Sequence, residues 1–186
     1  MDFYTREKSG AYIVLSGIMA AHLGWIFEIL LFLFMYGGVA DRGFGVLPFC
    51  PIYGITLVMV YYLIGTPHGG GMLLSRLGRG GARNIIYFIL ATLIPSVSEL
   101  MGGEVMERVS GEVLWSYEYI GYNYGKYICL PVSLGWGALI FVTMLFYDKF
   151  LSFIMRIPIA VARRLAFSFS LLLFLDFAGS LILSLI

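Results

Sequence analysis

An apolar run interrupted by two prolines, from Val46 to Gly65, places the strongest constraint on how this chain can fold. Its uninterrupted part after Pro51 is shorter than the roughly 20 helical residues that cross a hydrocarbon core of about 30 Å. A full span would have to include Pro48 and Pro51, which a regular helix cannot hold in its interior. Irregular backbone is tolerated in lipid only where protein or a watery cavity surrounds it. The run therefore predicts either a binding site at the break or an ordinary helix that begins at Pro51.

The composition assigns the chain to the integral membrane proteins. Hydrophobic residues make up 60% of its 186 residues and charged residues only 12%, against about 25% in soluble domains. We therefore expect one all-α domain over residues 1–186, a polytopic membrane helix bundle with about five transmembrane segments and a proline-interrupted second segment. The formal net charge of +1 argues against a basic binding face, so we expect no nucleic-acid partner.

Five apolar segments are candidate spans, at residues 11–36, 46–64, 84–101, 126–147 and 166–186. With these spans, nine basic residues fall on the side of the N-terminus and three on the other, which predicts a cytoplasmic N-terminus and a C-terminus outside. The nine are Arg6, Lys8, Arg76, Arg79, Arg83, Lys149, Arg156, Arg163 and Arg164, and the three are Arg42, Arg108 and Lys126.

Glu28 lies well inside the first segment, where a carboxyl group costs about 2.5 kcal/mol or more unless it faces the bundle interior. Gly17, Ala20, Ala21 and Gly24 precede it at helical spacing, and such small residues let another helix approach that face closely. Glu28 is therefore either a ligand-binding or proton-carrying carboxylate, or a carboxyl that hydrogen-bonds a neighbouring helix.

The sequence offers no metal site. His22 has no second His, Cys or carboxylate at ligand spacing, so we expect a packed histidine, no metal and no cofactor. Cys50 and Cys129 fall on the same predicted side of the membrane, where an oxidising exterior would allow a disulfide between them. Two buried thiols are the simpler expectation, because two cysteines impose no geometry through the sequence alone.

The connections between the segments differ in character. The glycine-rich stretch 65–83 lacks the Gly-Lys-Ser/Thr ending of a phosphate loop, and its basic residues predict a mobile cytoplasmic loop near lipid headgroups or a docking site for a cytoplasmic partner. Residues 102–125 predict a hydrophilic outer connection whose aromatic residues form either an interfacial belt or the wall of a ligand pocket. Residues 148–165 predict an interfacial amphipathic element interrupted by Pro158.

Two further features concern the third and fifth segments. Pro95 should kink the third, which also carries Glu99 near its outer end. Asp176 lies near the middle of the fifth segment and must pair with another group, either within the chain or on a partner helix.

With the predicted orientation, the acidic residues and the proline break gather in the outer half of the membrane. We infer one outward-facing polar cavity built from four separate pieces of chain. Its candidate substrate-binding residues are Trp25, Glu28, Tyr53, Glu99, Tyr117 and Asn123.

Several motifs occur in order along residues 11–147. They are Gly24-Trp25-x-x-Glu28, Pro48-Phe49-Cys50-Pro51-Ile52-Tyr53-Gly54, Glu99, Trp115-x-Tyr117, Asn123-x-Gly125-Lys126, Ile128-Cys129-Leu130, Ser133 and Trp136-Gly137. Together they resemble the ABC-transporter type IV (CmpB-like) family of bacterial membrane proteins. The resemblance implies a multi-pass protein of the bacterial cytoplasmic membrane with a role in transport. Ser116 stands where the family usually has Asp.

Three functions follow for testing. The first is a permease-like component that binds a small solute or ion from outside; since the sequence has no nucleotide motif, an ATPase would be a separate polypeptide. The second is an intramembrane enzyme on a lipid substrate, with Glu28 or Glu99 as base and Tyr53 as donor. The third is a structural or regulatory subunit of a membrane complex, with Asp176 at a partner helix. Each of the three functions is compatible with a homo-oligomer.

Overall fold

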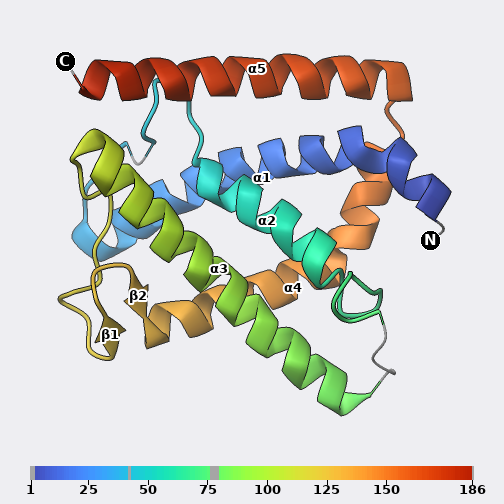
Figure 1. Cartoon of the computed structure of the whole chain (residues 1–186), viewed down its shortest axis with the longest axis horizontal. Coiled ribbons are helices and arrows are strands. Elements are labelled where there is room, and N and C mark those ends of the chain that lie inside the picture. Colours follow the sequence, from blue (N-terminus) through green and yellow to red (C-terminus); the bar gives the residue numbers. More distant parts are fainter. Residues whose placement is uncertain (1–2, 42, 76–79, 186) are drawn as a thin grey trace. The chain divides into compact units, whose positions relative to one another are not determined.

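The computed structural model describes residues 3–41, 43–75 and 80–185, with side chains from Gly10 onward. The helices of this described part are α1 Phe3–Tyr36, α2 Pro51–Leu63, α3 Gly81–Ser110, α4 Leu130–Ile154 and α5 Ile159–Ser184 (Figure 1). Four of them contain stretches long and apolar enough to cross a membrane, and α2 is shorter. The predicted all-α membrane fold with a proline-interrupted second segment is confirmed.

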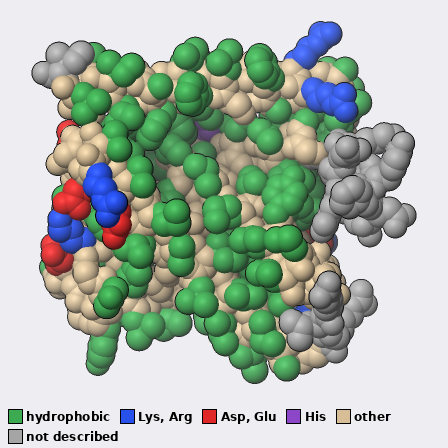
Figure 2. Space-filling view, in the orientation of Figure 1, with side chains coloured by type: hydrophobic (Ala, Val, Ile, Leu, Met, Phe, Trp, Pro, Cys, Tyr) green, Lys and Arg blue, Asp and Glu red, His purple; other side chains and the backbone are tan. Residues whose placement is uncertain are grey.

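The molecular surface agrees with this class. On the face shown in Figure 2, hydrophobic side chains cover most of the protein, with charged side chains confined to small groups. Large apolar side chains of α5 are widely exposed, among them Phe167, Phe174 and Leu183. A helix that is apolar on exposed faces needs lipid or protein around it, because water would not tolerate so much apolar surface.

Helices α3, α4 and α5 take in residues that the sequence assigned to connections. Residues 102–110 extend α3 rather than opening a connection, and α3 is continuous through the buried Pro95. Residues 148–154 continue α4, and α5 begins directly after Pro158, whose fixed φ suits a helix start. Residues 148–165 are therefore the end of α4 and the start of α5 rather than a connecting loop, with the break between them just before and at Pro158. Their interfacial character stays a prediction.

The chain divides into two compact units, Met1–Val58 with Leu151–Ile186, and Met59–Phe150. Each is described here by itself. Arg42, Arg76 and Arg79 lie outside the described residues, as do the side chains of Arg6 and Lys8, so the sidedness of the chain stays a prediction from the sequence.

In the first unit, small residues bring α1 and the start of α2 together. A Cβ added at Gly17 would lie 3.3 Å from the carbonyl oxygen of Gly54, and one added at Gly24 would overlap the Tyr53 ring. The N–H of Cys50 donates to the carbonyl of Ala21 on α1 at 3.0 Å, so backbone ahead of α2 finds a partner there. The small-residue face of the first segment is thus confirmed as a packing surface.

In the second unit, α3 and α4 run antiparallel. The Ser96 hydroxyl donates to the Ser133 hydroxyl at 2.7 Å, and Gly137 meets Thr92 so closely that a Cβ would overlap its side chain. As residue numbers rise along α3 they fall along α4, which is the register of two antiparallel helices. Ser133 and Gly137 thus allow the two helices to pack closely.

The chain folds back at the end of α2. The N–H groups of residues 71, 72 and 73 donate to the carbonyls of residues 64, 62 and 63 at 3.0, 3.1 and 2.8 Å. Gly65 has φ +72°, and a Cβ at Gly71 would overlap the backbone of Ile64 and Gly65, so this turn requires glycine. Thr66 and Leu74 are buried. The first part of the predicted mobile loop is therefore packed backbone; residues 76–79 lie outside the described part.

A short β-hairpin, absent from the sequence-based prediction, precedes α4. Strands β1 (Asn123–Tyr124) and β2 (Ile128–Cys129) pair antiparallel, with Asn123 opposite Cys129 and Tyr124 opposite Ile128. The hairpin lies against α3, because a Cβ at Gly103 would overlap the ring of Tyr127. Cys129 is a buried thiol, as is Cys50 in the first unit.

Candidate functional site

A carboxylate–tyrosine pair joins α1 to the first turn of α2. The Tyr53 hydroxyl donates to Glu28 Oε1 at 2.6 Å, and both side chains are half-buried. The rings of Phe27 and Tyr53 make an edge-to-face contact, with ring centroids 6.3 Å apart. Glu28 has its tyrosine partner at the place where α2 begins after the proline break, so the two features predicted separately from the sequence lie together.

Trp25 does not share this pair. Its indole N–H donates to Asp41 Oδ1 at 2.8 Å, and the N–H of Gly43 donates to the same oxygen at 2.9 Å. Trp25 therefore fastens the loop that follows α1. Asp41 accepts both hydrogen bonds.

Asp176 on α5 holds the segment that leads to the proline break. The N–H of Val46 donates to Oδ1 at 3.1 Å and the N–H of Leu47 donates to Oδ2 at 3.2 Å. The rings of Phe44 and Phe177 are in contact beside it, with centroids 5.3 Å apart. One carboxylate thus satisfies two consecutive backbone donors that no helix or strand would otherwise pair.

A second carboxylate–tyrosine pair lies in the other unit. The Tyr117 hydroxyl donates to Glu99 Oε1 at 2.6 Å, and only 6% of the Glu99 surface is exposed. Asn123 Nδ2 donates to the carbonyl of Tyr117 at 3.3 Å, and the N–H of Tyr117 donates to the carbonyl of Lys126 at 2.7 Å. Asn123 therefore holds the backbone that presents Tyr117, and acts on Glu99 only through it.

The aromatic residues of the connection divide between two roles. Trp115 and Tyr127 form an edge-to-face contact with centroids 5.8 Å apart, and Tyr127 is buried against α3. Tyr119, Tyr122 and Tyr124 are instead 70–83% exposed. Trp115 and Tyr127 are therefore packed side chains, and an interfacial belt formed by the exposed tyrosines stays a prediction.

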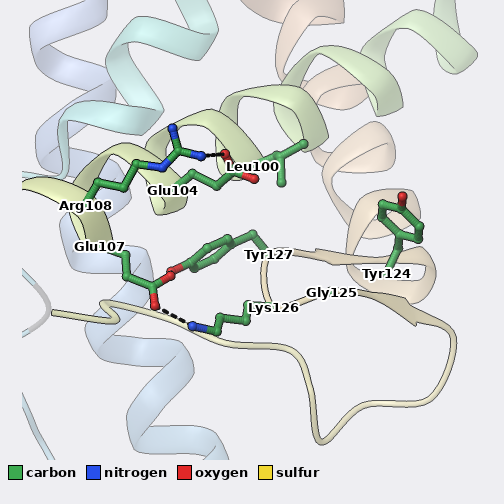
Figure 3. A pocket seen from close by; sticks show the side chains of 8 residues that line it. All are labelled: Leu100, Glu104, Glu107, Arg108, Tyr124, Gly125, Lys126 and Tyr127. Carbon is green, nitrogen blue, oxygen red and sulfur yellow. Dashed lines mark hydrogen bonds and ion pairs between the residues drawn. The ribbon is translucent and has the colours of Figure 1, made fainter. Parts of the chain in front are cut away.

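A groove of about 270 Å³ lies between α3 and the hairpin (Figure 3). Glu107 on α3 pairs with Lys126 and accepts a hydrogen bond from the Tyr127 hydroxyl at 2.7 Å. One turn away, Arg108 donates to Glu104 at 3.0 Å. We call this the α3–hairpin groove; its lining residues are Leu100, Glu104, Glu107, Arg108, Tyr124, Gly125, Lys126 and Tyr127.

The hydrogen bonds of this groove stabilise the protonated forms of Lys126 and Tyr127. The hydrogen bond to Glu107 raises the pKa of the Lys126 ammonium. Burial, with the hydrogen bond to Glu107 second, raises the pKa of Tyr127 to about 12. Lys126 therefore stays charged and Tyr127 stays a neutral donor over the physiological range.

No sequence pattern indicated the groove. Glu104 and Glu107 fall in the stretch predicted as a hydrophilic connection, although Glu104 and Arg108 stand at the i, i+4 spacing of a helical ion pair. That spacing was the available signal. The pairing of Glu107 with Lys126 and Tyr127 depends on the hairpin, which no local pattern indicated.

The predicted site residues thus fall into two groups. Glu28, Tyr53 and Trp25 belong to the first unit, and Glu99, Tyr117 and Asn123 to the second. One cavity shared by all six stays a prediction. Among residues 3–41, 43–75 and 80–185, no three His, Cys, Asp or Glu side chains are grouped so that they could hold a metal ion.

Comparison with known proteins identifies a family. The model of the family described as "Putative ABC-transporter type IV" matches residues 17–181. The match extends beyond the motifs found in the sequence and takes in α5 with Asp176, which the sequence-based resemblance had left out. No curated protein and no solved structure matches the chain.

Proposed function

The chain belongs to the ABC-transporter type IV family, and from that premise we propose that it is a permease-like component of a transport system that binds a small solute or ion. Family and fold together make it a multi-pass membrane protein associated with transport. The binding role, the bacterial cytoplasmic membrane as its location and the partner ATPase are our proposals.

The contact between Glu28 and Tyr53 carries the proposal. A glutamate inside an apolar span is expensive to retain, and such residues commonly mark solute or ion pathways. Here the carboxylate meets a tyrosine hydroxyl at the first turn of a helix too short to cross a membrane alone. Broken helices of this kind bind substrates and ions in transporters.

The pair suits a cation or a solute with N–H donors. Glu28 supplies a carboxylate acceptor, and the Tyr53 hydroxyl can turn from donating to Glu28 to accepting from the solute. The Glu99–Tyr117 pair offers the same chemistry in the other unit, with a more deeply buried carboxylate. We propose that each pair exchanges its internal hydrogen bond for one to the solute.

Energy for transport would come from a separate ATPase, because the sequence carries no nucleotide-binding motif. Affinity purification of the tagged chain from its native membrane tests this part. Recovery of an ATPase subunit with the chain supports the proposal. Repeated recovery without any ATPase contradicts it.

The binding role is tested by thermal unfolding of the purified chain with a panel of alkali and alkaline-earth cations, amino acids and small amines. At least one compound should raise Tm of the native chain, and Glu28→Gln or Tyr53→Phe should abolish that increase. Glu112→Gln, which changes an exposed carboxylate, is the matched control and should respond like the native chain. An equal response in all four proteins contradicts Glu28 as the binding group.

A further inference from the structure

We propose that the α3–hairpin groove binds the headgroup of a zwitterionic phospholipid that carries both a phosphodiester and a primary ammonium group. The groove is distinct from the Glu28–Tyr53 pair, and the proposal does not depend on the transport role. It rests on the position of the groove along α3, on its charges and on the hydrogen-bonding capacity that these charges retain.

The groove lies at the depth of lipid headgroups. By length and composition α3 (Gly81–Ser110) is a candidate span, and Glu104 and Arg108 stand in its last two turns. We therefore place this end of the helix among the lipid headgroups. The hairpin segment beside it exposes Tyr119, Tyr122 and Tyr124, a residue type enriched at the membrane–water interface. In Figure 2, side chains of both charges gather in one patch at the edge of the face, where α3 ends in Figure 1.

The groove carries two charges of each sign. Glu104 and Glu107 contribute two negative charges, and Arg108 and Lys126 two positive charges, so the four sum to zero. The side chains of Arg108 and Glu104 are 77% and 47% exposed, and those of Lys126 and Glu107 are 39% and 33% exposed. Ion pairs with this much solvent contact are weak, so a ligand of matching charges can take over their partners.

Both the basic and the acidic side chains of the groove can make further hydrogen bonds. Within the described part of the chain, Arg108 uses one of its five N–H donors, on Glu104, and Lys126 uses one of its three, on Glu107. A phosphodiester matches these donors, as arginine and lysine commonly bind phosphate oxygens. On Glu104 only Oε2 accepts from a described residue, which leaves Oε1 for an ammonium group.

These features discriminate among lipids. A choline headgroup has no N–H to donate to Glu104, and a glycerol headgroup has no positive charge to balance the carboxylates. Inorganic phosphate or a purely anionic headgroup would engage Arg108 and Lys126 but would leave Glu104 and Glu107 without a cationic partner. An ethanolamine headgroup offers a phosphodiester to the basic side chains and an ammonium group to the acidic ones. Leu100 in the lining can make apolar contact with the glycerol backbone of the lipid.

The test measures lipid binding to the full-length protein by native mass spectrometry. Phosphatidylethanolamine, phosphatidylcholine and phosphatidylglycerol with identical acyl chains are compared. We expect phosphatidylethanolamine to bind at least about fivefold more tightly than either, the factor of one charge-assisted hydrogen bond at an exposed site. Glu104→Gln should remove this preference, and Arg108→Gln should weaken all three lipids, because each contains a phosphodiester.

Glu112→Gln and Lys149→Gln are matched controls, since both change exposed charges outside the groove. Soluble glycerophosphoethanolamine should compete with the lipid only at much higher concentration, and inorganic phosphate should not compete. Equal binding of the three lipids, preference for phosphatidylglycerol, or a preference that survives Glu104→Gln would each overturn the proposal. Competition by inorganic phosphate alone would reassign the groove to simple anions and overturn it too.

Discussion

Replacing Asp176 by alanine removes the acceptor of two backbone donors in a single step. The N–H groups of Val46 and Leu47, next to the start of the proline break, would then lose this acceptor. The substitution leaves helix α5 intact, because alanine is the best helix former. The expected result is local opening of residues 44–50, with the rest of the chain folded.

The geometry sets the size of the effect. A good hydrogen bond to a charged group contributes about 1.5–3 kcal/mol. At 3.1 and 3.2 Å these two are longer than the usual 2.9–3.0 Å, and one of them is solvent-exposed. We therefore assign about 1 kcal/mol to each and about 2 kcal/mol to Asp176→Ala, a roughly 30-fold larger open population. Asp176→Asn keeps one oxygen acceptor and should give about fivefold.

Hydrogen exchange followed by mass spectrometry measures this population directly. The amides of Val46 and Leu47 should exchange about 30-fold faster in Asp176→Ala and about fivefold faster in Asp176→Asn, the factors that correspond to about 2 and about 1 kcal/mol. Ser170→Ala, an exposed change on the same helix, serves as the control and should leave the peptide unchanged.

Unchanged exchange of residues 44–50 in a folded Asp176→Ala protein would refute the reasoning, because the two bonds would then not hold the segment. An equal rise across α1 and α5 would refute it as well. That outcome would mean that the carboxylate supports the whole unit rather than this segment.

Three further outcomes are expected. Gly24→Val should lower the free energy of unfolding by about 2 kcal/mol, because its side chain would overlap the Tyr53 ring, whereas Gly10→Ala, with open space around its Cβ, should be neutral in the same thermal-unfolding assay. Gly71→Ala should cost about 1–3 kcal/mol by displacing the backbone at the end of α2, and faster limited proteolysis after residue 65 would report it. Because the folded-state pKa of Tyr127 is raised from 10.0 to about 12, its contribution is complete below pH 10 and is lost as the pH rises towards 12. Tyr127→Phe should flatten that fall in chemical denaturation, and an unaltered pH profile would count against the assignment.

The membrane class and the break before α2 could be predicted from the sequence, because composition and proline act locally. The small face of α1 could be predicted for the same reason, since Gly17, Ala21 and Gly24 recur at the helical period. The end of α3 could not. Glu104 and Glu107 make residues 102–110 look like a loop, yet they sit at a helix end where charged side chains reach water or the hairpin.

The carboxylate partners required three-dimensional information. A buried acid predicts a donor but does not name it, and the donor of Glu99 lies on Tyr117, beyond the end of its own helix. The acceptor role of Asp176 depends on two N–H groups that lie about 130 residues earlier in the chain. Neither pairing leaves a periodic trace in the sequence.

The turn at the end of α2 bears on how this part of the chain fits bilayers of different thickness. A helix of 13 residues measures about 20 Å, well below the hydrocarbon thickness of about 30 Å. Its last carbonyls are nevertheless paired, because residues 71–73 return to them, so that end needs no contact with water. Long helices must tilt or distort the bilayer to match it. The end of α2 requires neither tilting nor distortion of the bilayer. Thinning or thickening of the membrane would expose no unpaired backbone there.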